Sequence, residues 1–256
     1  MGSATDADAH GRGDGGREQG TEEDRGRDAL DTGDAPPTDA PPAGVDRALD
    51  AFRAGKPVLV HDAADREGET DLVYPAGAIT AEALARLRND AGGLVCVALS
   101  AAASDAFGLP FAHEAVDHPA VAGGELAYGD RPSFSLTVNH RETYTGITDE
   151  DRALTIAALA DAAAAPGDVE FADRFRVPGH VHLLRAAEGL LAERRGHTEL
   201  ALALADAADL PPAVVVCEML DGETGGALAP TDARAYAASH GFVYVEGARL
   251  VERLGG

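Results

Sequence analysis

Acidic side chains and one arginine are concentrated between residues 61 and 71 of this chain. The segment HDAADREGETD places Asp65, Arg66, Glu67, Glu69 and Asp71 within seven residues. Carboxylates this close repel one another unless a cation or an arginine neutralises them. Oxygen ligands of this kind suit Mg²⁺, which keeps several waters and takes only one or two protein carboxylates. The alternative is a solvated acidic loop without a ligand.

A second segment with chemical potential is RRGHTEL, residues 194 to 200, where a glycine and a histidine precede a helix that we expect to start near Thr198. Free backbone amides at the start of a helix attract a phosphate group, and the guanidinium group of Arg194 can donate two charged hydrogen bonds to it. The imidazole of His197 is available to bind a metal. The alternative is an ordinary helix N-cap beside a surface histidine.

Two further titratable residues fit structural roles as well as chemical ones. His180 follows Pro178-Gly179 at the expected start of a strand. A histidine in such a place is more often structural than an acid or a base. Glu218 directly follows Cys217 in the apolar run AVVVCEML, where burial would raise its pKa unless it is paired. A role in proton transfer would explain a glutamate in this apolar run, and so would a structural ion pair.

Helices and strands alternate along the chain from residue 45 onward. Helical spacing and caps predict helices at 45–52, 81–91, 148–165, 198–208 and 232–239, and apolar or alternating runs predict strands at 58–61, 94–99, 133–139, 213–219 and 242–245. In the strand at 133–139, Phe134, Leu136 and Val138 alternate with polar residues, as in a half-exposed strand. This order predicts an α+β fold with a mixed sheet covered by helices.

The charge balance excludes some partners. The chain has 256 residues, a net charge of −23 and a single lysine, Lys56, so it lacks the clustered cations that nucleic acid requires. The apolar runs are too short to span a membrane and the N-terminus does not resemble a signal peptide, so we expect a cytoplasmic protein. Dispersed acidity predicts a halophilic source, since salt near 1 M screens charges over roughly 3 Å. An ordinary acidic mesophilic protein is the alternative.

Residues 1–44 differ in composition from the remainder. They contain eleven acidic residues and four arginines and almost no large apolar residues, which predicts a disordered acidic tail. Recruitment of a partner by this tail is an alternative to an idle extension. We expect residues 45–256 to form one domain. Cys96 and Cys217 lie in apolar runs, where packed thiols are favoured over a disulfide or a metal pair.

Taken together, the segments resemble the 3,4-dihydroxy-2-butanone 4-phosphate synthases from about Val45 to the C-terminus. The motifs that carry the resemblance are, in order, DREGETD, SFSLTVNHR, YTGITDEDR, VPGHVHLLRAAEGL and RRGHTE. They are similar to the archaeal branch, whereas bacterial and plant members usually have DRENEGD, TTGxSAxDR, RPGHVFPL and RGGHTE. The chain departs from this second pattern at Gly68, Thr70, Tyr144, His182 and Arg195. Arg195 places a cation beside the predicted phosphate loop.

The resemblance implies a three-layer α+β sandwich that acts as a homodimer, with sites near the interface. It implies conversion of D-ribulose 5-phosphate to L-3,4-dihydroxy-2-butanone 4-phosphate and formate in riboflavin biosynthesis. Two Mg²⁺ ions per site are implied, with Mn²⁺ as a substitute. Some relatives carry a fused GTP cyclohydrolase II domain, and because this chain ends at Gly256 we expect it to be monofunctional.

The resemblance also implies roles for individual residues. Glu67 would bridge both metals and His197 would bind one of them. His180 and Glu218 would be the proton-transfer pair, with acid and base roles unassigned, and Glu69 would help to order the loop. The implied substrate-binding set is Arg66, Glu67, Asp71, Thr145, Arg194, Arg195, Gly196, His197, Thr198 and Glu218.

Two other functions remain open from the sequence. One is a catalytically silent sugar-phosphate-binding protein of the same fold, which the altered loop residues would permit. The other is a different metal-dependent lyase or isomerase of sugar phosphates, which would share most of the site. Turnover and product identity separate the three hypotheses.

Overall fold

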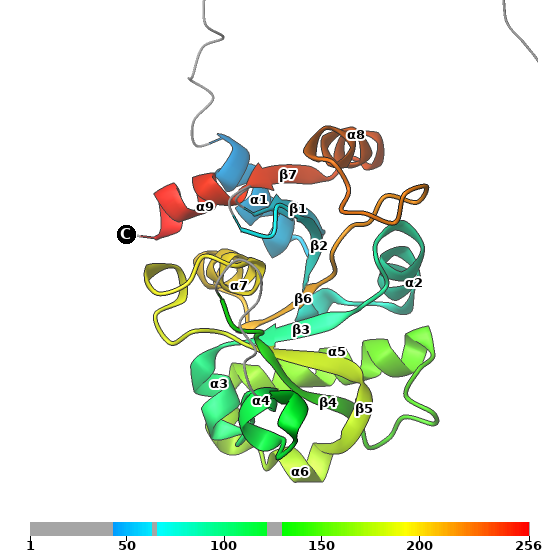
Figure 1. Cartoon of the computed structure of the whole chain (residues 1–256), viewed down its shortest axis with the longest axis vertical. Helices are drawn as coiled ribbons and strands as arrows, with labels where there is room; N and C mark the ends of the chain where they lie inside the picture. Colours follow the sequence, from blue (N-terminus) through cyan, green and yellow to red (C-terminus); the bar gives the residue numbers. More distant parts are fainter. Residues whose placement is uncertain (1–42, 63–65, 122–129, 256) are drawn as a thin grey trace, which may run out of the picture. The chain divides into compact units, whose positions relative to one another are not determined.

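The computed structural model describes residues 43–62, 66–121 and 130–255, and within them a single mixed sheet lies between two layers of helices (Figure 1). The strand order is β4-β5-β3-β6-β2-β1-β7. The strands are β1 (Val58–His61), β2 (Thr70–Pro75), β3 (Cys96–Leu99), β4 (Phe134–His140), β5 (Phe175–Arg185), β6 (Ala213–Val216) and β7 (Val243–Glu246).

Helices cover both faces of the sheet in the described part of the chain. They are α1 (Ala43–Arg53), α2 (Ala81–Asp90), α3 (Ala101–Ala106), α4 (Ala112–Ala115), α5 (Asp149–Ala164), α6 (Phe171–Arg174), α7 (His197–Ala207), α8 (Pro230–His240) and α9 (Gly247–Leu254). In Figure 1, α1, α7 and α9 cover one face, while α2, α5 and α8 cover the other. The predicted three-layer α+β sandwich is therefore confirmed.

Alternating strand side chains produce the two cores. On one face, Leu84 of α2 and Ile156 of α5 pack with Leu72 and Val97. On the other face, the core contains residues of α1, α7 and α9 together with strand residues such as Val60. Successive strand side chains point to opposite faces, which is why both cores draw on the same strands. Each buried side chain of this size stabilises the fold by about 1.5–3 kcal/mol.

The sheet places the acid-rich segment beside a distant strand. β1 and β2 pair antiparallel, with His61 opposite Thr70, so these two consecutive strands form a hairpin. β2 then pairs antiparallel with β6. Beyond this ladder, Asp71 and Glu218 form an isolated antiparallel bridge. Two segments that are far apart in the sequence therefore meet at one end of the sheet.

Most predicted elements are confirmed, with several corrections. Thr80 and Thr148 cap α2 and α5 through their side chains. By contrast, α7 begins at His197 and its N-cap is Gly196, which has no side chain to cap the helix. The sequence patterns did not predict β2, α3, α4, α6 or α9, and β5 begins at Phe175 rather than at His180. β2 was missed because all six of its residues are buried, so it lacks the alternation that marks a half-exposed strand.

The alternation predicted for the strand at 133–139 fails at its first residues. Phe134 is 38% exposed, whereas Ser135 is buried. The pairing of β4 with β5 shifts register between Phe134 and Thr137, and such a shift changes which face a side chain occupies. Val138, beyond the first shift, is buried as predicted.

Three remaining predictions have different outcomes. Cys96 and Cys217 are free and buried, which confirms packed thiols. Within the described ranges, none of the helices has the length and apolar character needed to cross a membrane. The proposed tail, residues 1–44, lies almost wholly outside the described residues, so its disorder stays a prediction.

Candidate active site

Glu67, from the connection between β1 and β2, meets His197, the first residue of α7. Glu67 Oε2 and His197 Nδ1 are 2.6 Å apart, and their side chains are 11% and 14% exposed. The structure thus brings together the two residues that the resemblance implies as metal ligands, although 130 positions separate them in the chain. Their role as ligands stays a prediction.

Asp71 and Glu218 join His197 in a compact cluster. One potential ligand atom from each of the three residues lies within 4.8 Å of the others. Asp71 is 1% exposed, and both of its carboxylate oxygens lack a hydrogen-bond partner among the described residues. A buried carboxylate without a partner is costly, so a compensating cation is expected. Several carboxylates around one imidazole fit a divalent metal ion.

The cluster shifts the pKa of two of its members. Burial raises the pKa of Asp71 to about 8, an effect that His197 opposes and that Glu218, Glu67 and Glu69 reinforce. Burial works against a charge on His197, but Asp71, Glu67 and Glu218 outweigh it and raise its pKa to about 10. The sequence had suggested Glu218 as the desolvated carboxylate. This was wrong, because Glu218 is half-buried and Asp71 is the fully buried group.

The loop that carries Glu67 is held by a residue that the sequence did not single out. The carboxylate of Asp62 accepts hydrogen bonds from the backbone N–H groups of Glu67 and Glu69, at 3.3 and 3.1 Å. Asp62 belongs to the same acidic segment, so its position after β1 was the available signal. Burial raises the pKa of Glu69, and nearby Glu218 and Glu67 add to the rise. Asp65 lies outside the described residues.

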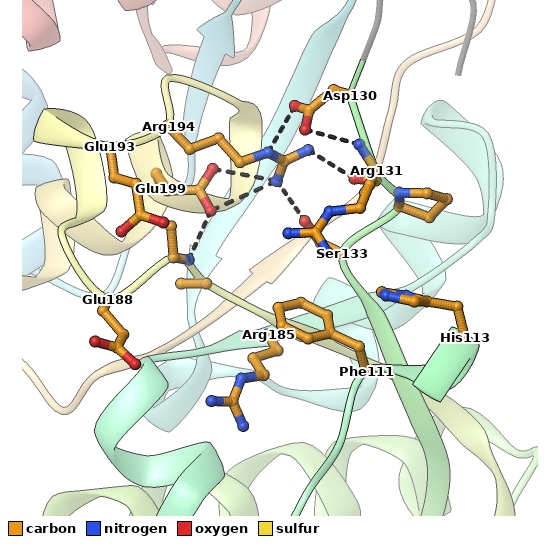
Figure 2. Close-up of a pocket in the computed structure, with 13 residues that line it drawn as sticks. Phe111, His113, Asp130, Arg131, Ser133, Arg185, Glu188, Glu193, Arg194 and Glu199 are labelled. Carbon is orange, nitrogen blue, oxygen red and sulfur yellow. Dashed lines mark hydrogen bonds and ion pairs between the residues drawn. The ribbon is translucent and has the colours of Figure 1, made fainter. Parts of the chain in front are cut away.

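Two arginines converge next to this cluster. Arg66 Nη2 and Arg194 Nε donate to the same oxygen of Asp130, Oδ2, at 3.1 and 2.7 Å. Figure 2 shows how Arg194 also points toward Ser133 and Glu199. Its Nη1 donates to Ser133 Oγ and, at 3.3 Å, to Glu199 Oε2. Glu199 is fully buried, so it anchors Arg194 from below the surface. Glu199 ends the RRGHTE motif but was given no role from the sequence, and none of the motifs contains Asp130.

The first turn of α7 completes an anion-binding environment. Because Gly196 carries no side chain, Arg66 can approach it, and a Cβ at this position would lie 3.0 Å from Arg66 Nη2. Thr198 Oγ1 is buried and has no hydrogen-bond partner among the described residues. A helix start flanked by arginines attracts anions such as phosphate. Arg195 is exposed at this end of the helix.

His180 lies elsewhere in the sheet, on β5, where Asn139 of β4 holds it. Its backbone N–H donates to Asn139 Oδ1 at 2.8 Å, so the amide nitrogen of Asn139 faces His180 Nδ1 at 3.1 Å. His180 Nδ1 also lies 3.3 Å from Asn139 Oδ1, so the Asn139 amide holds the Nδ1 edge of the imidazole and leaves Nε2 outside this contact. Asn139 was not singled out from the sequence.

Thr145 belongs to the same region as His180. Its hydroxyl donates to Asp151, and the next residue, Gly146, has a φ of +92° and lies against Asn139. Among the described residues, no hydrogen bond links His180 or Thr145 to Asp71, Glu218 or His197. The structure therefore gathers most of the implied site residues around the end of β2, whereas His180 lies on β5, which β3 and β6 separate from β2.

Comparison with known proteins agrees with this geometry. Residues 46–253 match the family model described as 3,4-dihydroxy-2-butanone 4-phosphate synthase. The synthase of that name from Methanosarcina mazei is 47% identical, over 81% of this chain and 90% of the relative. The one from Archaeoglobus fulgidus is 46% identical, over 81% of this chain and 92% of the relative.

A solved structure with the same architecture carries metal ions. It is a 3,4-dihydroxy-2-butanone 4-phosphate synthase in complex with two magnesium ions, with a TM-score of 0.69 and 30% identity, over 82% of this chain and 95% of the other. The fold, the cluster and these matches lead to one assignment. This chain belongs to the 3,4-dihydroxy-2-butanone 4-phosphate synthase family.

Proposed function

We propose that this chain is the lyase that converts D-ribulose 5-phosphate to L-3,4-dihydroxy-2-butanone 4-phosphate and formate in riboflavin biosynthesis. The observation that carries the proposal is the contact between Glu67 and His197, with Asp71 and Glu218 close by. The catalytically silent binding protein is not favoured, since the relatives are named as synthases.

A divalent cation fits this cluster. Glu67 and His197 would hold it, and the unpartnered oxygens of Asp71 indicate missing positive charge. When bound, Mg²⁺ would act as a Lewis acid toward substrate oxygens. We extend the proposal to two Mg²⁺ ions per site, in line with the magnesium-bound relative, and to Mn²⁺ as a substitute.

The residues of the chain have separate tasks in this proposal. Arg66, Arg194 and the first turn of α7, with Thr198, hold the phosphate and so orient the sugar. Asp71 is positioned to contact substrate hydroxyls. Glu218 and His180 form the proton-transfer pair, which removes the hydrogen next to the ketone and assists loss of a hydroxyl. Because the Asn139 amide contacts Nδ1 of His180, Nε2 is the ring nitrogen left to exchange a proton with the substrate.

We also propose that the protein acts as a homodimer with its sites near the interface. Two site residues, Thr145 and His180, lie away from the cluster, and exposed apolar side chains accompany them in sequence. Tyr144 is 95%, Ile147 52% and Val177 50% exposed. Apolar surface of this kind, gathered around polar residues, is typical of a protein interface. A second copy of the chain bound to this surface would bring Thr145 and His180 of one subunit toward the acidic cluster of the other.

The same proposal includes three expectations from the sequence: a cytoplasmic location, adaptation to high salt, and no nucleic-acid or membrane partner. The net charge of −23 supports the adaptation to high salt and the lack of such partners. Activity that rises with KCl concentration toward the molar range would support the high-salt adaptation, and activity lost in molar KCl would refute it.

A formate assay tests the proposed reaction. The purified chain is incubated with D-ribulose 5-phosphate and MgCl₂ in molar KCl, and formate and the four-carbon phosphate are quantified. We expect both products in equal amounts, and no product after treatment with EDTA. A different product would indicate another sugar-phosphate lyase or isomerase. Calorimetric binding of the substrate without any turnover would indicate the silent binding protein.

A further inference from the structure

One carboxylate oxygen lies between the two arginines of the site. Asp130 Oδ2 accepts from Arg66 Nη2 and from Arg194 Nε, while its other oxygen, Oδ1, accepts the backbone N–H of Arg131 at 2.8 Å. The side chains of Asp130, Arg66 and Arg194 are only 24%, 20% and 16% exposed. The carboxylate is therefore held in a partly buried position between two guanidinium groups. An anion from outside the protein would bind well in the same position.

The donors of Arg194 are almost all engaged. Nε donates to Asp130, Nη1 to Ser133 and Glu199, and Nη2 to the carbonyl of Arg131 at 3.4 Å. Figure 2 shows these contacts arranged around the guanidinium group. A phosphate that accepts two hydrogen bonds from Arg194 must replace at least one of these acceptors. Glu199 is fully buried, so Asp130 is the charged acceptor that can leave toward solvent.

The charges near the arginines also favour replacement of the Asp130 carboxylate by a phosphate group. Two positive groups, Arg66 and Arg194, face three carboxylates, Asp130, Glu199 and Asp62, of which Asp62 lies 3.9 Å from Arg66. Burial works against the charge of Asp130, but its hydrogen bonds, above all from Arg194, hold its pKa below the ordinary value. A phosphate dianion placed beside an ionised Asp130 would be repelled.

We propose that Asp130 is an internal competitor for the substrate's phosphate group. Its carboxylate occupies the place between Arg66 and Arg194, and the phosphate replaces it when substrate binds. Asp130 is thus a specificity-determining residue, because a ligand gains entry only if its anion binds the arginine pair more strongly than a carboxylate does. The inference rests on the proposed function for the assignment of these arginines to phosphate.

The opposite role for Asp130 makes the opposite prediction. If Asp130 served to align the two arginines for phosphate, its removal would weaken phosphate binding. If it competes with phosphate, its removal strengthens binding, because the ligand no longer has to break a charged hydrogen-bond pair. The sign of the effect therefore decides between the two roles.

The test measures binding of inorganic phosphate by calorimetry to the full chain, in EDTA so that no metal contributes. We expect Asp130→Asn and Asp130→Ala to lower the dissociation constant about tenfold, equivalent to about 1.4 kcal/mol. In the magnesium-loaded enzyme, KM for ribulose 5-phosphate should fall while kcat stays level, as for a change in binding shared by ground and transition states.

Two control variants isolate the effect. Ser133→Ala removes an acceptor of Arg194 without changing charge, and it should not strengthen phosphate binding. Asp168→Asn removes one charge at an exposed position, and it should leave phosphate binding unchanged. If Asp168→Asn strengthens binding as much as Asp130→Asn does, net charge explains the result and the inference fails.

The remaining outcomes are also decisive. Unchanged or weaker phosphate binding in both Asp130 variants, with circular dichroism showing an intact fold, would overturn the inference. Phosphate calorimetry needs no turnover, so it tests Asp130 even if the wild-type chain makes no formate. Formate production by the wild type together with unchanged phosphate affinity in the variants would leave the proposed function standing without this inference.

Discussion

Asp71 on β2 and Glu218, just beyond β6, lie opposite each other in an antiparallel bridge, and of the two only Asp71 is fully buried. The bridge holds two carboxylates next to His197. Such an arrangement is unfavourable until positive charge is added. The cluster therefore lowers the stability of the metal-free protein and at the same time favours binding of a cation, a compromise that is common at functional sites.

The first prediction concerns Asp71. In the metal-free protein, Asp71→Asn should not lower the melting temperature, because the replacement removes a buried carboxyl group whose oxygens have no hydrogen-bond partner among the described residues. The wild type should gain stability from Mg²⁺, about 2.7 kcal/mol at a hundred times the dissociation constant, whereas the variant should gain much less. Differential scanning calorimetry with and without MgCl₂ measures both effects. Equal stabilisation of the two proteins would contradict the assignment of Asp71 to the cation site.

The second prediction concerns the contact between Glu67 and His197. Glu67→Gln or His197→Ala should lower turnover by about two to four orders of magnitude, as expected when a group that acts in the chemistry is removed. Circular dichroism should show the fold intact. Glu223→Gln, at an exposed position outside the site, is the matched control and should keep full activity. Unfolding of the two site variants would show that the contact is structural instead.

The third prediction is a pH dependence at His182, where the chain departs from the bacterial motif. Burial lowers the pKa of His182, and its Nδ1 has no hydrogen-bond partner among the described residues. The unfolded chain therefore binds a proton there more readily than the folded chain, and stability is lost as pH falls below about 6.5. His182→Phe should remove this loss.

Urea unfolding of the wild type and of His182→Phe at a series of pH values measures this effect. The stability difference between the two proteins should shift in favour of the variant as pH falls from 7 to 5, and it should be constant above pH 7. A difference that does not depend on pH would show that the substitution acts through packing against Phe134, whose ring centre lies 6.2 Å from that of His182.

The fourth prediction tests the homodimer. Ile147→Asp places a charge on the exposed apolar surface beside Thr145, so it should convert a dimer to a monomer and reduce activity together with it. Val116→Asp, at another exposed apolar side chain, is the control and should remain dimeric. Light scattering coupled to size exclusion reports the mass. A wild-type monomer that is fully active would refute the proposed dimer and the role given to it.

The fifth prediction tests the N-terminal segment. Removal of residues 1–42 ends the deletion at the start of α1, whose Val45, Leu49 and Phe52 are buried. Activity and melting temperature should stay nearly unchanged, because the deleted residues carry almost no apolar surface to bury. A large loss of either quantity would show that the segment is not an idle extension.

Local patterns predicted those features of the fold that depend on neighbouring residues. Helical spacing with a Thr cap located α2 and α5, and apolar runs located β1, β3 and β6. β2 escaped prediction because it is buried on both faces, and the start of β4 was misjudged because a register shift turned Phe134 outward. Register and burial depend on strand partners that are distant in the sequence.

The sequence by itself determined which residues could do chemistry, since motif order and residue type identified Glu67, Asp71, His197 and Glu218 without coordinates. Only the tertiary structure decided how these groups act on one another. The pairing of β2 with the segment after β6 buried Asp71 rather than Glu218, and the approach of Asp130 to Arg66 and Arg194 has no counterpart in any motif. Charge, burial and hydrogen bonding depend on distances in space, and chain separation does not encode those distances.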